Sequence, residues 1–320
     1  RSVGLCLAAQ HGVEALPDPG PDIGQGTNQV GTEIDHRRQQ RAAGDAGGSV
    51  GAALYAWHQI AGNPRSAATV GDDMRGSYLG PEFSSGEIAE YLSARGYPFE
   101  TVADEGTRAD KIARLLAEGH IVGLFQGRME FGPRALGNRS ILGDARSPQM
   151  QSVMNLKIKY RESFRPFAPA VLEERAKEYF DLDVLSPYML LVSTVREGLR
   201  TAAGDHKSDS IRAEVNRMRS SIPAVTHVDY SARIQTVSRH TNPFFHDILT
   251  SFDELTACPV LVNTSFNIRG EPIACTPEDA YRCFMNTEMD YLILEDHLLE
   301  KRQQPNRENR ELFAVSTVLD

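Results

Sequence analysis

GRMEFGPRALGNRSILGDAR, residues 127–146, is the most informative stretch of this 320-residue sequence. Its four arginines are interleaved with glycines, and NLKIKYRESFRPF, residues 155–167, follows closely with four further cations. Only three acidic residues, Glu130, Asp144 and Glu162, lie among these eight cations. The mutual repulsion of the cations is costly unless an anion or folded-state carboxylates offset it. The cations are Arg128, Arg134, Arg139, Arg146, Lys157, Lys159, Arg161 and Arg165.

The residue types in this segment favour a site for a small anion. Arginine offers a planar fork suited to phosphate or carboxylate, lysine offers a point charge, and glycine lets backbone N–H groups approach an oxyanion closely. The alternative is a run of solvated surface cations. Phe131, Leu136, Ile141 and Leu142 interrupt the run and are expected to anchor it in a core, so the residues alone leave both interpretations open.

Helix and strand patterns alternate around this segment and predict a mixed α/β fold. Thr107 reads as a helix N-cap and Gly119 as the end of that helix, and Ser147-Pro148 reads as the start of another. Asn242–Leu255 is amphipathic, and Thr276-Pro277 opens a further helix. The expected strands are 121–125, 189–195, 233–237, 259–263 and 291–294.

A second polar cluster, Asn263–Gly270 (NTSFNIRG), follows the expected strand 259–263. Hydroxyl and amide groups at the C-terminal end of a strand stand where α/β sheets commonly bind ligands. The same residue types also form capped turns, which remains the alternative. His227 is expected to be structural. Arg233 either points into the expected ligand cleft or is an ordinary exposed arginine.

The composition limits the remaining functions. A net charge of −9 argues against general nucleic-acid binding. The four cysteines form no Cys-x-x-Cys pair and indicate reduced thiols in the cytoplasm, and no apolar run has the ~20 residues that a membrane helix needs. Asp45, in the turn Gly44–Gly48 before a predicted helix, is either a cap or a ligand for a metal or a nucleotide hydroxyl.

Taken together, these segments resemble the O-carbamoyltransferases of antibiotic and nodulation-factor biosynthesis, such as the tobramycin and cephamycin enzymes. The resemblance covers residues 42–58 and about 76–301, in the order of the family. It rests on AAGDAGGSVGAALYAWH, GRMEFGPRALGNRSIL, KYRESFRPFAPAV, AVTHVDYSARIQTV, LVNTSFNIRGEPI and TPEDAYRCFMNTEMDYLILE.

The resemblance implies an α/β architecture in which a YrdC-like mixed twisted sheet with helices follows the remnant of an actin-like domain. The YrdC-like domain is expected to form carbamoyl adenylate from carbamoyl phosphate and ATP with Mg²⁺, and the actin-like domain to pass the carbamoyl group to a hydroxyl of a small molecule. The implied parts are a remnant at 1–62, a linker at 63–80, a YrdC-like domain at 81–302 and a polar tail at 303–320.

The resemblance also assigns roles to individual residues. Lys159, Arg134 and Arg233 are implied to be catalytic, and Ser265 and Asn267 to form the Ser-x-Asn pair of YrdC-like sites. Asp45 matches the aspartate that ligates iron in the complete actin-like domain. The residues implied to hold carbamoyl phosphate or the adenylate are Arg128, Arg134, Lys159, Arg165, Arg233, Ser265 and Asn267.

The sequence departs from the family pattern near its beginning. Most of the actin-like domain is absent, including the two histidines that would complete the iron site, so the chain is interpreted as a fragment. Residues 9–41 stand where the family continues with a Gly-Gly-Val-Ala-Leu-Asn loop, and we interpret them as read out of frame. Two alternatives remain: a synthase of threonylcarbamoyl adenylate, and an inactive fragment that binds anions or nucleotides.

Overall fold

The computed structural model describes residues 45–65, 74–201 and 217–305. The expected out-of-frame segment 9–41 and the tail from 306 onward lie outside the described residues. The predicted helix is present as α1 (Asp45–Tyr55), which continues into the π-helical turn η2 (Ala56–Ile60), but residues 45–48, predicted to form a turn before it, already belong to the helix.

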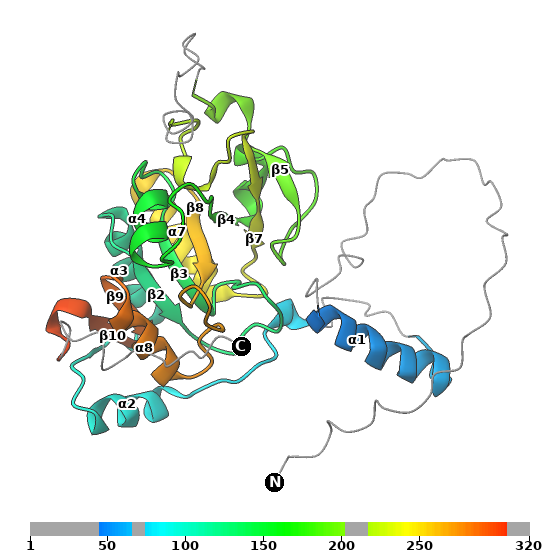
Figure 1. The fold of residues 1–320 in the computed structure, drawn as a ribbon, viewed down its shortest axis with the longest axis horizontal. Helices are drawn as coiled ribbons and strands as arrows, with labels where there is room; N and C mark the ends of the chain where they lie inside the picture. The colour runs from blue at the N-terminus through cyan, green and yellow to red at the C-terminus, as the bar shows by residue number, and fades with distance from the viewer. Residues whose placement is uncertain (1–44, 66–73, 202–216, 306–320) are drawn as a thin grey trace. The chain divides into compact units, whose positions relative to one another are not determined.

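Eight strands form one mixed sheet, which confirms the predicted α/β class (Figure 1). β2 pairs with β9 and β4 with β7 in parallel, and the other neighbours in the sheet are antiparallel. In spatial order the strands are β1 (Glu100–Thr101), β10 (His297–Glu300), β9 (Tyr291–Leu294), β2 (Val122–Phe125), β3 (Arg139–Asp144), β8 (Val260–Ser265), β4 (Ala168–Leu172) and β7 (Gln235–Val237).

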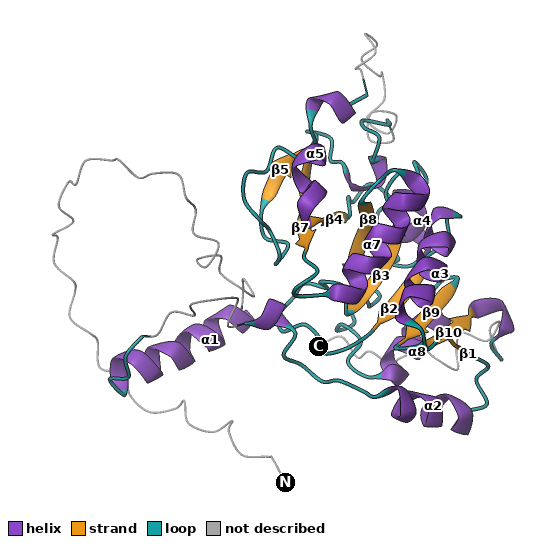
Figure 2. Ribbon diagram, turned by 180° about the vertical axis from the view of Figure 1, so that it is seen from behind, coloured by secondary structure: helices purple, strands orange, loops and turns teal. Residues whose placement is uncertain are grey.

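Helices cover both faces of this sheet (Figures 1 and 2). α3 (Glu105–Ala117) packs on α7 (Pro243–Thr256), and the pair covers one face of the central strands. α4 (Met150–Lys157) and α8 (Pro277–Asn286) lie on the other face. Buried apolar residues from all these elements form one core, which includes Leu124, Ile141, Val262, Phe245 and Phe284.

Shorter elements complete the described chain. α2 (Ser85–Ala94) begins with a capping box on Ser84, and α5 (Ala176–Tyr179) is one turn long. β5 (Val192–Thr194) and β6 (Ser231–Arg233) form a separate antiparallel pair. The 3₁₀ turns are η3 (Arg75–Ser77), η4 (Glu173–Arg175), η5 (Glu197–Leu199), η6 (Pro223–Val225) and η7 (Lys301–Gln303).

Several predicted boundaries need correction. The N-cap of α3 is Asp104, whose carboxylate accepts the Thr107 N–H at 2.8 Å, so Thr107 is not the cap. α4 begins at Met150, without a side-chain cap, rather than at Ser147-Pro148. The expected strand 189–195 shortens to β5, and the expected strand 233–237 is divided into β6 and β7 because the Ile234 N–H leaves the ladder to donate to Leu191. β10, after the expected last strand, was not predicted.

Other local predictions are confirmed. The helix predicted from Asn242 is α7, which Asn242 caps through the Phe245 N–H, and the helix predicted to open at Thr276-Pro277 is α8, where Thr276 forms a capping box with Asp279. Gly119, just beyond α3, has a φ of 89°, a conformation that favours glycine over other residues. None of the described helices is long and apolar enough to cross a bilayer.

Candidate anion-binding site

Lys159, just past the end of α4, is the centre of the candidate site. Its side chain is only 4% exposed, and its ammonium group meets the segment at the end of β8. Nζ donates to the carbonyl oxygens of Ser265 (2.5 Å) and Asn267 (2.8 Å) and to Asn267 Oδ1 (2.9 Å). Ser265 Oγ is 3.4 Å away. The structure therefore brings together three of the residues predicted from sequence.

The Ser265–Asn267 segment is also a hydrogen-bonded turn. Ser265 Oγ donates to Asn267 Oδ1 at 2.7 Å, and Asn267 Nδ2 donates to the Glu271 carbonyl at 2.7 Å. Phe266 between them is fully buried and fixes the turn to the core. The turn interpretation and the ligand interpretation are thus compatible, because the same two side chains hold the loop and face Lys159.

Burial lowers the pKa of Lys159 to about 7. Cys283 beside it opposes this shift, and the positive charge of Arg161 adds to it. Charging an amine in a dry environment is costly unless an opposite charge is near. A bound anion would supply that charge, and it would raise the pKa of Lys159.

Arg134 and Arg233 form a second group of cations. Arg134 lies in the loop 131–138 between β2 and β3, and Arg233 ends β6. Within the described residues, the Nε of each is buried without a hydrogen-bond partner. Burial first, and then the charge of Arg134, lowers the pKa of Arg233. Two neighbouring arginines without a carboxylate partner in the described part are an arrangement that an anion would stabilise.

Buried side chains fix the loop that carries Arg134. The Glu130 carboxylate accepts the backbone N–H groups of Leu136 at 2.7 Å, Asn138 at 2.8 Å and Arg139 at 3.2 Å. The Leu136 carbonyl accepts from Gln235 at 2.8 Å. The local sequence carries no signal for this network, because Glu130 reaches N–H groups six to nine residues further on and Gln235 is 99 residues from Leu136.

Asn263 connects this loop to the Lys159 cluster. Its Nδ2 donates to the Ala135 carbonyl at 3.1 Å and to Gln235 Oε1 at 2.6 Å. Asn263 precedes Ser265 by two residues on β8. The Arg134 loop therefore lies against the strand that ends at Ser265.

Two of the arginines in the initial stretch are structural. Arg139 is fully buried, donates to the carbonyls of Gln126 (2.7 Å) and Gly127 (3.1 Å), and stacks 3.5 Å from the centre of the Phe125 ring. Arg146 pairs with Asp144 at 2.8 Å. The carbonyls and the carboxylate that hold these two explain how so many cations are tolerated there.

Arg128 and Arg165, both predicted to bind the ligand, are half-exposed. Arg128 faces Glu82 at 3.3 Å and lines a separate hollow of about 560 Å³ with Glu87 and Glu295. No described contact brings Arg128 to Lys159. Arg165 pairs with Glu162 at 3.3 Å, six residues after Lys159.

Arg161, which was not among the predicted site residues, belongs to this cluster. Its charge acts on Lys159, and burial followed by the charge of Arg165 lowers its own pKa. Its Nε donates to Asn155 Oδ1 at 2.6 Å, and its guanidinium stacks 4.9 Å from the centre of the Phe167 ring. The available sequence signal was its place two residues after Lys159.

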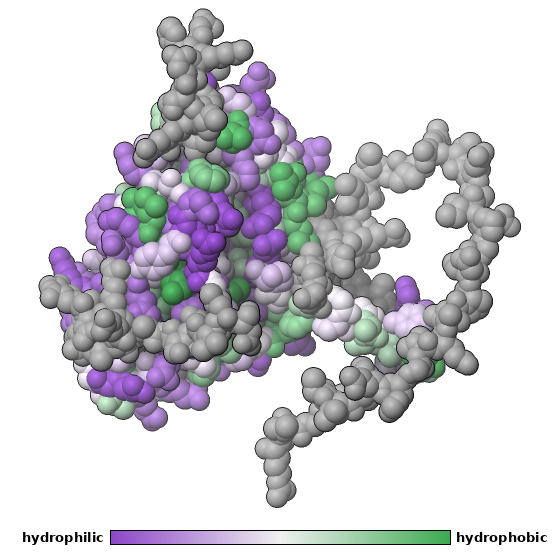
Figure 3. All heavy atoms as spheres, viewed as in Figure 1, coloured by the Kyte–Doolittle hydropathy of each residue, from purple (hydrophilic) through white to green (hydrophobic). Residues whose placement is uncertain are grey.

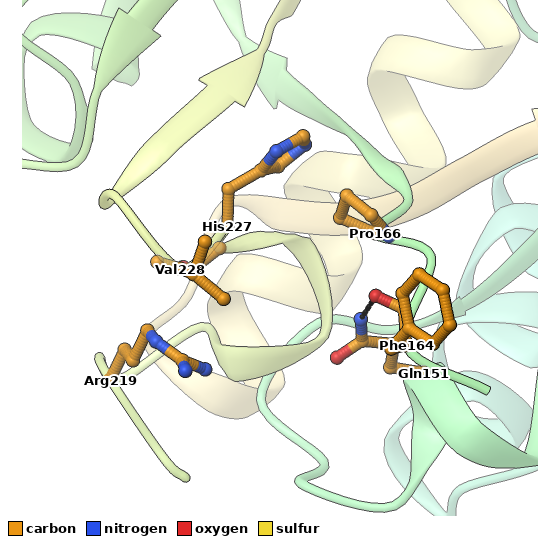
Figure 4. Close-up of a pocket in the computed structure, with 7 residues that line it drawn as sticks. Gln151, Phe164, Pro166, Arg219, His227 and Val228 are labelled. Atoms are coloured by element: carbon orange, nitrogen blue, oxygen red, sulfur yellow. Dashed lines mark hydrogen bonds between the residues drawn. The ribbon is translucent and has the colours of Figure 1, made fainter. Parts of the chain in front are cut away.

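A cavity of about 150 Å³ borders this loop. Figure 4 shows it between His227 and Val228 on one side and Phe164 and Pro166 on the other. Burial lowers the pKa of half-buried His227. Asp229 opposes this shift and Arg233 reinforces it, so the charge of Arg233 acts on His227. Hydrophilic residues gather near the centre of the face drawn in Figure 3.

The described residues do not fit a resident metal. No group of three His, Cys, Asp or Glu side chains in this part of the chain is arranged to hold an ion. Asp45, predicted to ligate iron, is the first residue of α1. We therefore derive no step through iron.

The fold and the site together define a mixed α/β protein with a cluster of cations at the end of its central strands. Residues 113–301, more than half of the chain, match the family described as Carbamoyltransferase C-terminus. The chain belongs to this family, as the resemblance of its motifs indicated.

Curated relatives agree with this membership. An uncharacterized protein of Synechocystis (sll1178) is 57% identical over 88% of this chain and 46% of its own length. Nodulation protein NolO of Bradyrhizobium diazoefficiens is 38% identical over 82% of this chain and 44% of its own length. Nodulation protein NolNO of Sinorhizobium fredii is 39% identical over 82% of this chain and 36% of its own length. The chain thus spans less than half the length of these relatives.

A solved structure also aligns with part of the chain. It is full-length HypF in a phosphate- and nucleotide-bound form, with a TM-score of 0.36 and 16% identity over 59% of this chain and 25% of that one. A likeness of this size transfers no function.

Proposed function

We propose that this chain makes carbamoyl adenylate from carbamoyl phosphate and ATP, as the first step of an O-carbamoyltransferase reaction. The observation that supports it most is the buried Lys159, held against Ser265 and Asn267. Arg134 and Arg233, without carboxylate partners in the described part, add the charge that a phosphate dianion needs.

The chemistry suits these groups. Water releases phosphate from carbamoyl phosphate, an oxygen of the resulting carbamate attacks the α-phosphorus of ATP, and pyrophosphate leaves. Lys159 and the arginines stabilise the charge that develops on the phosphoryl oxygens, while Ser265 and Asn267 hydrogen-bond the carbamoyl end. No covalent intermediate on the protein is required. Mg²⁺ would accompany the ATP phosphates and neutralise part of their charge.

The cavity of Figure 4 is the place we propose for the nucleoside of ATP. It adjoins the loop of Arg161 and Arg165, and the Phe164 ring at its edge is more than half exposed. An exposed aromatic ring offers a stacking surface for a planar base.

We propose that the complete protein then passes the carbamoyl group to a hydroxyl of a small-molecule acceptor, in the cytoplasm. The acceptor class stays open between an aminoglycoside, a cephem and a lipo-oligosaccharide. The relatives named nodulation proteins support the last of these. In the family this second step needs iron. The described residues do not contain the side chains that would complete an iron site.

The test is to incubate the chain with ATP, Mg²⁺ and carbamoyl phosphate and to measure pyrophosphate and carbamoyl adenylate. We expect both products, and neither when carbamoyl phosphate is left out. A folded chain that binds carbamoyl phosphate without forming either product would favour the inactive binding fragment. Product formed only from bicarbonate, threonine and ATP would favour the threonylcarbamoyl-adenylate synthase.

A further inference from the structure

The loop 158–167, which carries Lys159, Arg161 and Arg165, is organised by one buried side chain. Asn155, in the last turn of α4, is fully buried. Its Oδ1 accepts from Arg161 Nε at 2.6 Å, and its Nδ2 donates to the carbonyls of Ser163 at 3.1 Å and Arg165 at 2.7 Å. Its own carbonyl accepts the Arg161 N–H at 3.0 Å.

These bonds act on two arginines that repel each other. Burial first, and then the charge of Arg165, lowers the pKa of Arg161, so the two positive charges act on each other. Asn155 uses only the Nε of Arg161, and no described hydrogen bond or ion pair engages its two terminal nitrogens. Those nitrogens form the fork that binds a phosphate through two parallel hydrogen bonds. Glu162, which pairs with Arg165 at 3.3 Å, offsets only part of this repulsion, so without Asn155 the two side chains would tend to point apart.

We propose that Asn155 is a positioning residue for anion binding, which holds Arg161 and the Arg165 backbone so that both cations face one phosphate group. It does not touch the ligand and acts only through this loop. The inference rests on the proposed function for the identity of the ligand, but the loop geometry is independent of the nucleotide chemistry.

The chain offers a matched control. Gln304 is also a buried amide, whose Nε2 donates to the carbonyls of Pro98 at 2.9 Å and Glu300 at 3.1 Å and whose Oε1 accepts from Tyr281 at 3.2 Å. Asn155→Leu and Gln304→Leu therefore remove the same number of side-chain hydrogen bonds, with an arginine as the donor in the first and a tyrosine hydroxyl in the second. A purely structural role predicts similar losses of thermal stability for both variants and equal anion affinity.

The experiment measures sulfate and carbamoyl-phosphate affinity by calorimetry, below the unfolding temperature of each variant. We expect Asn155→Leu to weaken both by about tenfold, as the loss of one charge-assisted contact would, and Gln304→Leu to leave both unchanged. Equal affinities for the two variants would overturn the proposal. A wild-type chain that binds sulfate but not carbamoyl phosphate would contradict the proposed function. The sulfate affinities of the two variants would still test the role of Asn155 in that case.

A double-mutant cycle identifies the route of the effect. The Asn155→Leu loss should shrink when Arg161→Ala is already present and stay complete in an Arg134→Ala background, because Arg134 lies on another loop. Equal losses in both backgrounds would contradict positioning. If Asn155→Leu does not fold, Arg161→Lys is the second test, since it keeps the charge but has neither the Nε–H that Asn155 holds nor the fork that binds phosphate. We expect that variant to lose about as much sulfate affinity as Arg161→Ala, and wild-type affinity would overturn the inference.

Discussion

The ammonium group of Lys159 lies 2.9 Å from Asn267 Oδ1 and 2.8 Å from the Asn267 carbonyl oxygen, although 108 residues separate the two along the chain. Four oxygen atoms of Ser265 and Asn267 surround this one nitrogen. The ammonium is therefore fixed in place before any ligand binds, which is the condition for strong electrostatic stabilisation.

Replacing Lys159 with alanine should lower carbamoyl-phosphate affinity by about 1.5–3 kcal/mol, the range for a charge-assisted hydrogen bond. Calorimetric titration measures this change. The matched control is Lys111→Ala, because Lys111 pairs with Glu100 at 2.6 Å on the surface. Unchanged affinity in Lys159→Ala would remove this residue from the site.

Anion affinity should fall as the pH rises above about 7, the value to which burial lowers the pKa of Lys159. Only the ammonium form attracts an anion, so each pH unit above that value should cost up to about tenfold in affinity. Sulfate is the right probe, because it does not titrate in this range. The slope should vanish in Lys159→Met, and a flat wild-type profile would contradict the assigned role.

The same pKa predicts the pH dependence of stability. The folded pKa of Lys159 lies below its unfolded value of 10.5, so between these two values the unfolded chain binds more protons than the folded chain. The contribution of Lys159 to the free energy of unfolding therefore rises with pH from about 7 to about 10.5. Urea unfolding at several pH values should show this rise in the wild type relative to Lys159→Met, and parallel curves would argue against a depressed pKa.

Arg233→Ala should weaken anion binding while costing little stability without a ligand. Truncation removes a charge that has no carboxylate partner in the described part and that Arg134 repels. Sulfate should consequently raise the unfolding temperature of the wild type more than that of the variant. Arg196→Ala, which removes an exposed arginine 3.6 Å from Asp181, is the control. An equal sulfate response in Arg233→Ala and wild type would place the anion elsewhere.

Periodicity and capping residues were enough to predict the sheet class and most long elements. The helix of Asn242–Leu255 and the strand 291–294 came close to their observed bounds, because each buries one regular pattern. Short elements were missed where tertiary contacts rather than local pattern define them. β10 is one example, since it forms by pairing with β9 and β1.

The site was predicted only in part, for a physical reason. Arg134 and Arg139 have similar glycine-rich surroundings in the sequence, yet the terminal nitrogens of Arg139 donate to carbonyl oxygens while no described hydrogen bond or ion pair engages Arg134. Which arginine meets carbonyls and which remains available depends on the strand register and on distant groups. Glu130 and Asn155 were missed for the same reason, because a buried carboxylate or amide gives no local signal of what it holds.

Gly137→Ala should test whether the shape of the Arg134 loop matters for binding. Gly137 has a φ of 114°, and an added Cβ would lie 2.4 Å from the Phe245 ring. Relief requires movement of the loop or of α7, with a destabilisation of about 1–3 kcal/mol.

Because the loop that contains Gly137 carries Arg134, movement of the backbone should also reduce sulfate affinity at temperatures where the variant is still folded. Gly198→Ala is the matched control, since no atom lies within 4 Å of its added Cβ, and it should change neither property. A Gly137→Ala variant that is destabilised but binds sulfate normally would separate Arg134 from the anion. A loss of both properties would show that the loop has to keep this conformation for Arg134 to reach the ligand.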